Sequence, residues 1–374
     1  MQANLGVRVA TSRHAGVTLR SQQRPKAPMS RGRKCPGPPG QRCSTLVVQS
    51  AVAASYPTFP VGTAGRELDK NGRERLALKE EGWQYWKWAC GGKEHNCHYI
   101  TEGEEGSPVV LVHGFGAHAY HWRYTIPALS KKHKVYSLCL LGYGWSDKPP
   151  LEYSGEVWAK QVADFCREVV GTTEVTLVGN SIGGIACMSA GALMPGLRGL
   201  CLLNSAGNLD IEEEVPIDLA SLEKLEDTEV QISAMDKLKK TFGRLVVQGI
   251  FLGTKYRIKY FLDKVYLNPE YVDASLVKSI FNPACDPMAP AAFFELSKAG
   301  GRTQFTIRGV LKQLTAPMLV LHGNQDPWMK VERSEKFARL YSNATVVPID
   351  AGHCPQDDNP DAVNSNLLRF LETL

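Results

Sequence analysis

Val175-Thr-Leu-Val-Gly-Asn-Ser-Ile-Gly-Gly184 is the stretch from which the rest of the chain can be understood. Its first residues are mainly apolar and predict a short buried strand, and the small, mostly apolar run Ile185–Leu193 predicts a helix packed closely on a sheet. The turn between them, Gly179-Asn-Ser-Ile-Gly183, has the pattern G-x-S-x-G. In a strand–turn–helix setting this pattern predicts a nucleophile elbow that presents the Ser181 hydroxyl above the sheet edge. The alternative is a glycine-rich turn that contains a serine by chance.

A second glycine-rich turn follows another predicted strand. Pro108–Val112 is a continuous apolar run, which suits a strand covered on both faces, and it leads into His113-Gly-Phe-Gly116. An H-G-x-G loop of this kind accompanies the elbow, because its glycines let the backbone turn inward. The backbone N–H groups of Phe115 and Ile182 are therefore candidates for an oxyanion hole. We expect His113 to hold the loop rather than to act as a base.

Two polar residues at strand ends complete a constellation with Ser181. Asp326 follows the predicted strand Met318–His322, and His353 follows the predicted strand Thr345–Ile349. Because the carboxyl ends of parallel strands share one edge of a sheet, the three side chains are expected to meet there. The chain order Ser, Asp, His is the one that belongs with the elbow. Serine needs a base to take its proton and the base needs an orienting group, so the set predicts a catalytic triad.

Other polar residues near these strand ends are poorer candidates for the acid. Asp350, Asp357 and Asp358 flank His353, but none of them occupies a strand-to-helix turn as Asp326 does. The strand after the elbow ends in Asn204 and supplies no carboxylate. Taken singly, an aspartate after a strand is usually a turn residue, and it is the combination that favours Asp326.

Strands and helices alternate in two parts of the chain, residues 83–207 and 305–374, which predicts a mostly parallel, doubly wound sheet of the α/β class. Trp83–Trp88 and His98–Glu102 predict an antiparallel pair at its edge. Residues 208–304 contain no clear strand and predict an inserted helical cap over the site. Further short helices are expected within Glu67–Glu81 and over His121–Ser130.

The predicted cap contains an apolar and basic run that continues to Leu262. Basic residues beside Phe, Ile, Leu and Tyr fit two alternatives, an ordinary amphipathic lid helix or a helix that lies on a membrane surface. Two candidates for lining the substrate pocket, His118 and Trp122, lie close to the predicted oxyanion loop, and Trp328 lies close to Asp326. For His118 the alternative is a packing role within a helix.

Charge is distributed unevenly. The first 66 residues hold ten Lys and Arg residues and no Asp or Glu, so the chain from Glu67 onward has 33 basic and 38 acidic residues despite a net charge of +5 overall. The basic total is therefore no argument for nucleic-acid binding. A segment rich in Arg and Ser without acids is typical of an organellar transit peptide, and residues 1–55 are expected to be a plastid leader or a disordered basic tail.

Eight cysteines outside this leader are scattered without zinc-ligand spacing, and we expect buried free thiols. No run approaches the roughly 18 apolar residues of a membrane span. The predicted chemistry requires no metal and no organic cofactor.

The chain resembles the α/β-hydrolase superfamily from about Trp86 to its end. The motifs that carry the resemblance are Val112–Gly116, Leu140–Pro149, Gly179–Gly184, Leu202–Gly207, Asp326–Trp328 and Gly352–Asp357. They are similar to a plastid branch that includes pheophytinases and chlorophyll dephytylases. Dehalogenases and most epoxide hydrolases of this fold use aspartate at the elbow, and Ser181 argues against both. Cys139 stands where the family usually has aspartate, which puts the anchoring of the following loop in question.

The resemblance implies the α/β-hydrolase fold and a plastid serine hydrolase that removes phytol from chlorophyll or pheophytin, with a cap that contacts the thylakoid surface. Three alternatives stay open from the sequence. These are an esterase or lipase for another acyl ester, an acyltransferase or perhydrolase, and a non-catalytic binding protein with the same fold. The oligomeric state is not predicted.

Overall fold

The computed structural model describes residues 65–218, 220, 254–299 and 303–374, and the predicted leader lies outside them. Its centre is an eight-stranded sheet in the order β10-β9-β8-β7-β5-β6-β4-β3. The strands are β3 (Gln84–Cys90), β4 (Lys93–Glu102), β5 (Pro108–Val112), β6 (Lys134–Leu138), β7 (Thr176–Asn180), β8 (Gly199–Leu203), β9 (Met318–Gly323) and β10 (Ala344–Ile349). Strands β5 to β10 run parallel, whereas β4 and β3 are antiparallel at one edge. The predicted mostly parallel sheet and its aromatic edge pair are confirmed.

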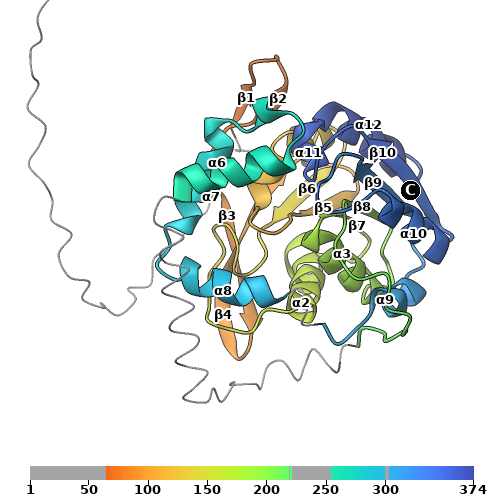
Figure 1. The fold of residues 1–374 in the computed structure, drawn as a ribbon. Coiled ribbons are helices and arrows are strands. Elements are labelled where there is room, and N and C mark those ends of the chain that lie inside the picture. The colour runs from red at the N-terminus through yellow and green to blue at the C-terminus, as the bar shows by residue number, and fades with distance from the viewer. Residues whose placement is uncertain (1–64, 219, 221–253, 300–302) are drawn as a thin grey trace, which may run out of the picture. The chain divides into compact units, whose positions relative to one another are not determined.

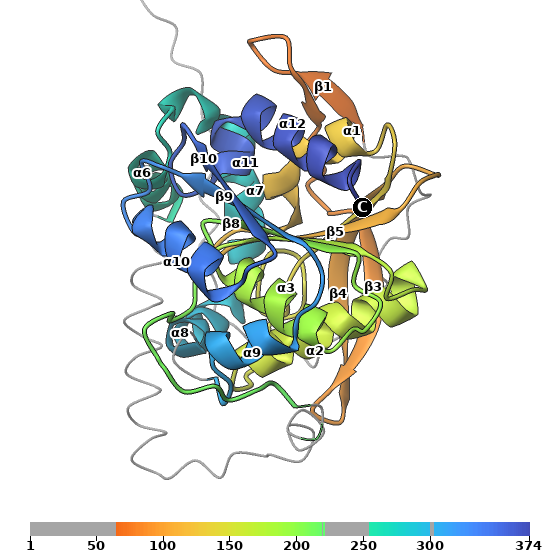
Figure 2. The ribbon, with the colours of Figure 1, turned by 90° about the vertical axis from the view of Figure 1, so that its right-hand side faces the viewer.

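Helices cover both faces of the sheet (Figure 2). One face carries α1 (Thr125–Leu129), α11 (Pro355–Asp358) and α12 (Pro360–Leu371). The other face carries α2 (Gly155–Phe165), α3 (Ile182–Ala192), α9 (Ile307–Gln313) and α10 (Glu332–Leu340). Two separate hydrophobic clusters lie between these helices and the sheet. Because both faces are covered, the central strands β5 and β8 have no polar side chain and do not alternate.

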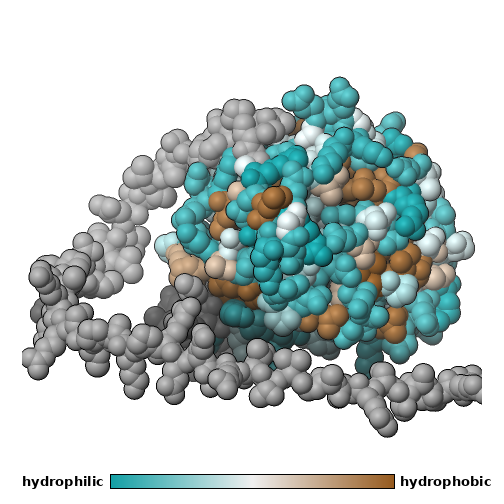
Figure 3. Space-filling model, turned by 90° about the horizontal axis from the view of Figure 1, so that it is seen from above, coloured by the Kyte–Doolittle hydropathy of each residue, from teal (hydrophilic) through white to brown (hydrophobic). Residues whose placement is uncertain are grey.

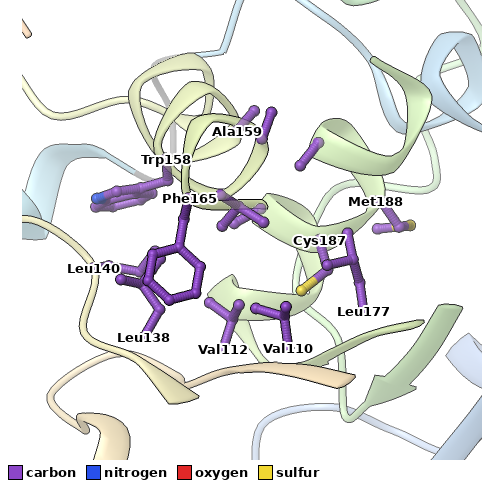
Figure 4. Packing of buried hydrophobic residues seen from close by; sticks show 14 of the residues in the cluster. Val110, Val112, Leu138, Leu140, Trp158, Ala159, Phe165, Leu177, Cys187 and Met188 are labelled. Carbon is purple, nitrogen blue, oxygen red and sulfur yellow. The ribbon is translucent and has the colours of Figure 1, made fainter. Parts of the chain in front are cut away.

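Side chains of α2 and α3 interlock with β5 in the larger cluster (Figure 4). Phe165 from α2 is fully buried and contacts Trp86 edge-on, with ring centroids 5.6 Å apart. Cys187 of α3 is likewise buried over the strands. The aromatic residues of β3 therefore serve packing. This cluster fixes α3, and with it the turn that precedes α3, against the centre of the sheet.

Further helices lie in the chain between β8 and α9. They are α6 (Thr254–Val265), the 3₁₀ turn η4 (Pro269–Tyr271), α7 (Ala274–Ala284) and α8 (Ala289–Ala299). Helices α6 and α7 lie together, whereas α8 lies nearer to α2 (Figure 1). The Asp273 carboxylate caps α7 by accepting the Leu276 N–H at 2.8 Å. The described part of residues 208–304 contains no strand.

The prediction of a short helix within Glu67–Glu81 is wrong. The segment forms a hairpin of β1 (Arg66–Leu68) and β2 (Glu74–Leu76). Its turn is set by the Asp69 side chain, which accepts the N–H groups of Asn71 and Arg73 at 2.8 Å each. Gly72 takes the left-handed conformation that the turn requires, with φ 77°. A side-chain-capped turn thus prevails over helix propensity.

The prediction of a single helix over His121–Ser130 is also wrong. The segment instead forms a 3₁₀ turn, η1 (Ala119–Trp122), followed by α1. The Arg123 carbonyl would accept the N–H of residue 127 in a continuous helix, but that residue is Pro127 and has no N–H. Leu76 N–H instead donates to the Arg123 carbonyl at 2.9 Å. The break joins this segment to β2.

The face shown in Figure 3 is mainly hydrophilic, with hydrophobic side chains in separate groups. Among the helices in the described residues, none has both the length and the hydrophobicity needed to cross a bilayer. The eight cysteines in that part of the chain are free thiols, seven of them buried. The described residues contain no group of His, Cys, Asp and Glu side chains able to hold a metal ion.

We expect Phe165→Ala to lower the free energy of unfolding by about 3–5 kcal/mol, because it leaves a cavity beneath α2. Urea denaturation followed by circular dichroism measures this. The matched control is Leu68→Ala, which removes an exposed side chain and should change stability by less than about 0.5 kcal/mol. Equal losses in both variants would contradict the packing described here.

Candidate active site

The turn between β7 and α3 holds Ser181 in an unusual backbone conformation, with φ 54° and ψ −117°. Such a conformation is strained for a residue with a side chain and is typical of a nucleophile elbow. The following turn packs so tightly that a Cβ on Gly183 would lie 2.4 Å from the Val112 carbonyl oxygen. A Cβ on Gly179 would lie 2.3 Å from the Gly183 carbonyl oxygen. The two glycines of the motif are therefore required by contact with β5 and α3.

Asp326 and His353 meet at the carboxyl ends of β9 and β10. His353 Nδ1–H donates to Asp326 Oδ2 at 2.6 Å, and the aspartate side chain is fully buried. The Trp328 N–H donates to the other carboxylate oxygen at 2.8 Å. Burial acts to raise the pKa of Asp326, but the hydrogen bond from His353 and the other donors outweigh it and lower the pKa. The carboxylate stays ionised and fixes the histidine ring with Nε2 turned away from it.

Asn204 is the residue of this site that sequence reasoning missed. Its Nδ2 donates to Asp326 Oδ2 at 2.6 Å, and its Oδ1 accepts the Gly323 N–H at 2.9 Å. Asn204 lies at the end of β8 with φ 44°. Its position at a strand end next to the elbow strand was a usable signal, since strand ends of a parallel sheet gather at one edge.

The Asn180 side chain links the serine turn to the histidine loop. Asn180 Nδ2 donates to the Leu203 carbonyl at 3.1 Å and to the His353 carbonyl at 3.0 Å. Since Ser181 is the next residue, this amide holds the serine and histidine backbones side by side. The structure thus gathers the three residues of the predicted triad at one edge of the sheet.

The predicted oxyanion loop lies against the elbow. A Cβ on Gly114 would be 3.1 Å from Ser181 Cβ, so Phe115 begins directly beside the serine. Ile182 is the first residue of α3, where helix N–H groups lack intrahelical partners. His113 anchors the loop, since its Nε2 accepts the Leu140 N–H at 3.0 Å and its Nδ1–H donates to the Gly114 carbonyl at 2.7 Å. Complete burial lowers the pKa of His113 to about 3, so its ring is neutral.

The three candidates for substrate contact lie in different surroundings. Trp122 is 0% exposed within the cluster below α1 and α12, so it is a core residue and not a pocket residue. His118 is also buried, and its Nε2–H donates to Ser279 Oγ of α7 at 3.0 Å, which makes it a structural link. Trp328 is 58% exposed and its ring stands edge-on to His353, with centroids 4.8 Å apart. Phe115, which is 45% exposed and contacts Phe293 of α8, is a better pocket candidate than Trp122.

A buried ionic cluster joins α7 to the core near the histidine loop. Arg123 is 0% exposed, and its Nε donates to Asp357 Oδ1 at 2.7 Å. Its Nη1 donates to both oxygens of Asp273, the capping residue of α7, at 3.0 Å. Tyr266 donates its hydroxyl to Asp357 at 2.8 Å. Burial raises the pKa of the Asp357 carboxyl against the opposing effect of the Arg123 guanidinium.

The neighbouring Asp358 binds the end of α6 to the histidine loop. Its carboxylate accepts the N–H groups of Leu267 and Asn268 at 2.8 Å each and that of Gly352 at 2.6 Å. The His353 N–H itself donates to the Val265 carbonyl at 2.8 Å. Helix α6 is therefore hydrogen-bonded to the loop that carries His353.

Cys139 does not leave the loop after β6 unanchored. Its buried Sγ accepts the Ala119 N–H at 3.3 Å, and burial raises the pKa of the thiol to about 12. The loop is fastened instead by Ser146, whose hydroxyl donates to the Cys139 carbonyl at 2.9 Å and accepts the His98 N–H at 2.9 Å.

The profile of the alpha/beta hydrolase family matches residues 109–366. The chain belongs to this family. One relative of this alpha/beta hydrolase is the 2-hydroxy-6-oxo-6-(2'-aminophenyl)hexa-2,4-dienoic acid hydrolase of Metapseudomonas resinovorans. It is 26% identical over 308 residues, which cover 80% of this chain and 96% of that protein. Another relative is the chloroplastic pheophytinase of Arabidopsis thaliana, 27% identical over 315 residues that cover 74% of this chain and 64% of that protein.

Solved structures show the same fold. A serine hydrolase involved in carbazole degradation (CarC enzyme) superposes with a TM-score of 0.58 at 23% identity, covering 78% of this chain and 100% of that one. The relatives named here include hydrolases of different substrates. They support a hydrolytic activity for this alpha/beta hydrolase.

We expect Asp326→Asn to slow labelling of Ser181 by a fluorophosphonate probe roughly a thousandfold, because the amide cannot hold His353 in the same tautomer. The control is Asp350→Asn. Asp350, like Asp326, precedes His353 in the sequence, but its carboxylate is exposed. Its labelling rate should match that of the unmodified protein. A comparable loss in both variants would exclude a specific role for Asp326.

We expect Arg123→Met to destabilise the protein by about 3–5 kcal/mol, because it leaves Asp357 buried without its cation. Thermal and urea unfolding measure the loss. Arg339→Met, which removes an exposed pair with Glu335, should cost less than about 1 kcal/mol. If the two variants unfold alike, the Arg123 cluster does not hold α7 to the core.

Proposed function

We propose that this alpha/beta hydrolase is a serine carboxylic-ester hydrolase of the plastid that acts on a hydrophobic ester, the phytyl ester of chlorophyll or pheophytin. The observation that carries the proposal is the 2.6 Å hydrogen bond between His353 and Asp326 beside the strained Ser181 turn. A base oriented by a buried carboxylate, next to a serine held in a strained turn, is the arrangement that serine esterases need.

In the proposed mechanism His353 takes the proton of Ser181 as the serine oxygen attacks the ester carbonyl. The N–H groups of Phe115 and Ile182 stabilise the oxyanion of the tetrahedral intermediate. His353 then protonates the departing alcohol, and a water molecule, activated by the same histidine, releases the acid and restores the serine. Asp326 keeps Nδ1 protonated and stabilises the imidazolium.

Three observations support the hydrophobic ester and the plastid. Exposed aromatic rings, Phe115 and Trp328, flank the serine and the histidine respectively. The chain is similar to a chloroplastic pheophytinase, and its first 66 residues have the basic, acid-free composition of a transit peptide.

The test is hydrolysis of chlorophyll a and pheophytin a by the full-length protein in detergent, with phytol release as the measurement. We expect Ser181→Ala to reduce release roughly a thousandfold or more. Ser189→Ala is the matched control, since Ser189 lies on the helix that follows the elbow and its buried hydroxyl makes no hydrogen bond among the described residues. This control should retain full activity.

Cleavage of p-nitrophenyl esters through Ser181, without release of phytol from either pigment, would leave a serine esterase and refute the pigment substrate. A correctly folded protein that hydrolyses none of these esters would refute the proposed activity and favour a binding protein.

A further inference from the structure

Helix α6 has two chemically distinct faces. Ile258, Leu262 and Val265, spaced i, i+4 and i+7, turn inward and pack in a cluster with α7. Arg257, Tyr260, Phe261 and Lys264, spaced i, i+3, i+4 and i+7, are exposed and share another side of the helix. Tyr260 and Phe261 are each 60% exposed. We call these four residues the outer face of α6.

The outer face combines aromatic rings with positive charge. The Tyr260 and Phe261 rings contact each other edge-on, with centroids 6.0 Å apart. The Lys264 ammonium lies 5.3 Å from the centroid of the Tyr260 ring. The acidic residue of this part of the helix, Asp263, is a neighbour of Tyr260 at i+3, but it is paired with Lys259 at 2.7 Å. The outer face therefore presents two cations and two aromatic rings without an acid among them.

Another surface helix shows what an ordinary solvated face looks like here. The exposed residues of α10 include Glu332, Glu335 and Arg339, and the last two form an i,i+4 pair. That face mixes both signs of charge and exposes no aromatic ring. The outer face of α6 differs in both respects, so solvation alone does not account for it.

We propose that the outer face of α6 docks on the surface of an anionic lipid bilayer. Aromatic rings are well suited to the headgroup region, because their apolar bodies enter the acyl boundary while a polar tip stays hydrated. Arg257 and Lys264 extend their charged ends toward anionic headgroups while their alkyl parts stay with the rings. The charge of the face selects an anionic surface over a neutral one.

Docking by α6 brings the lipid surface close to the candidate active site. The last turn of α6 is tied to the histidine loop by the Val265 carbonyl, which accepts the His353 N–H at 2.8 Å. Exposed Trp328 stands against the His353 ring. If the proposed function holds, on which this step rests, a membrane-dissolved ester reaches Ser181 from the bilayer without first crossing water.

The experiment is co-sedimentation of the full-length protein with vesicles of phosphatidylglycerol and phosphatidylcholine, compared with vesicles of phosphatidylcholine alone. We expect Arg257→Gln/Lys264→Gln to weaken binding to the anionic vesicles about tenfold, and Tyr260→Ser/Phe261→Ser to do the same. Leu68→Ser and Lys93→Gln, which change exposed apolar and basic residues elsewhere, should bind as the unmodified protein does. The basic N-terminal segment is present in every protein compared, so it cannot produce these differences.

Binding to anionic vesicles that is unchanged in both α6 variants would overturn the proposal. So would vesicle binding that survives while light scattering shows that the α6 variants have lost self-association, because the face would then serve a second copy of the chain.

A second measurement separates docking from the proposed function. The α6 variants should hydrolyse a water-soluble p-nitrophenyl ester at the unmodified rate and lose about tenfold in rate on the same ester group carried by vesicle lipid. Ser181→Ala should retain full vesicle binding. If no ester is hydrolysed but the α6 variants still lose vesicle binding, the docking surface stands and the proposed function fails.

Discussion

The side-chain amide of Asn180 links the serine turn, the end of β8 and the histidine loop. Asn180 Nδ2 donates both to β8, at Leu203, and to the histidine loop, at His353. It does so from the residue before Ser181, at a point where the neighbouring loop packs closely, since a Cβ on Gly114 would lie 2.8 Å from Asn180 Oδ1. One buried donor thus holds the backbones of Ser181, Leu203 and His353 in their relative positions.

Much of the fold follows from the sequence because the central parallel strands are buried on both faces. Runs such as Pro108–Val112 are apolar at every position and can be placed by inspection. The errors occurred where a single long-range or local contact outweighs propensity. The hairpin at Arg66–Leu76 depends on one aspartate-capped turn, and the break before α1 depends on a hydrogen bond from Leu76 to Arg123.

The candidate site was predictable to the extent that its residues stand at strand ends. Ser181, Asp326 and His353 each follow a recognisable strand, so their proximity follows from topology. The partners that orient them are harder to recognise, because their roles depend on distances across the fold, and only Asn204 has the signal of a strand-end position. Asn204 meets Asp326 over 122 positions, and Arg123 meets Asp357 over 234. In sequence Asp357 is simply an acid near a histidine, and Trp122 is simply an aromatic residue near a loop.

The hydrogen bonds of Asp358 and the His353 N–H to the end of α6 have a consequence for how such a protein can be rebuilt. Helices α6 and α7 share their anchoring residues with the histidine loop, so they belong mechanically to the core. A chimaera that exchanges residues 208–304 for the corresponding segment of another hydrolase would replace partners of Asp357 and Asp358 and disturb the loop. A boundary placed before α6 keeps Tyr266 and Asp273 with Arg123.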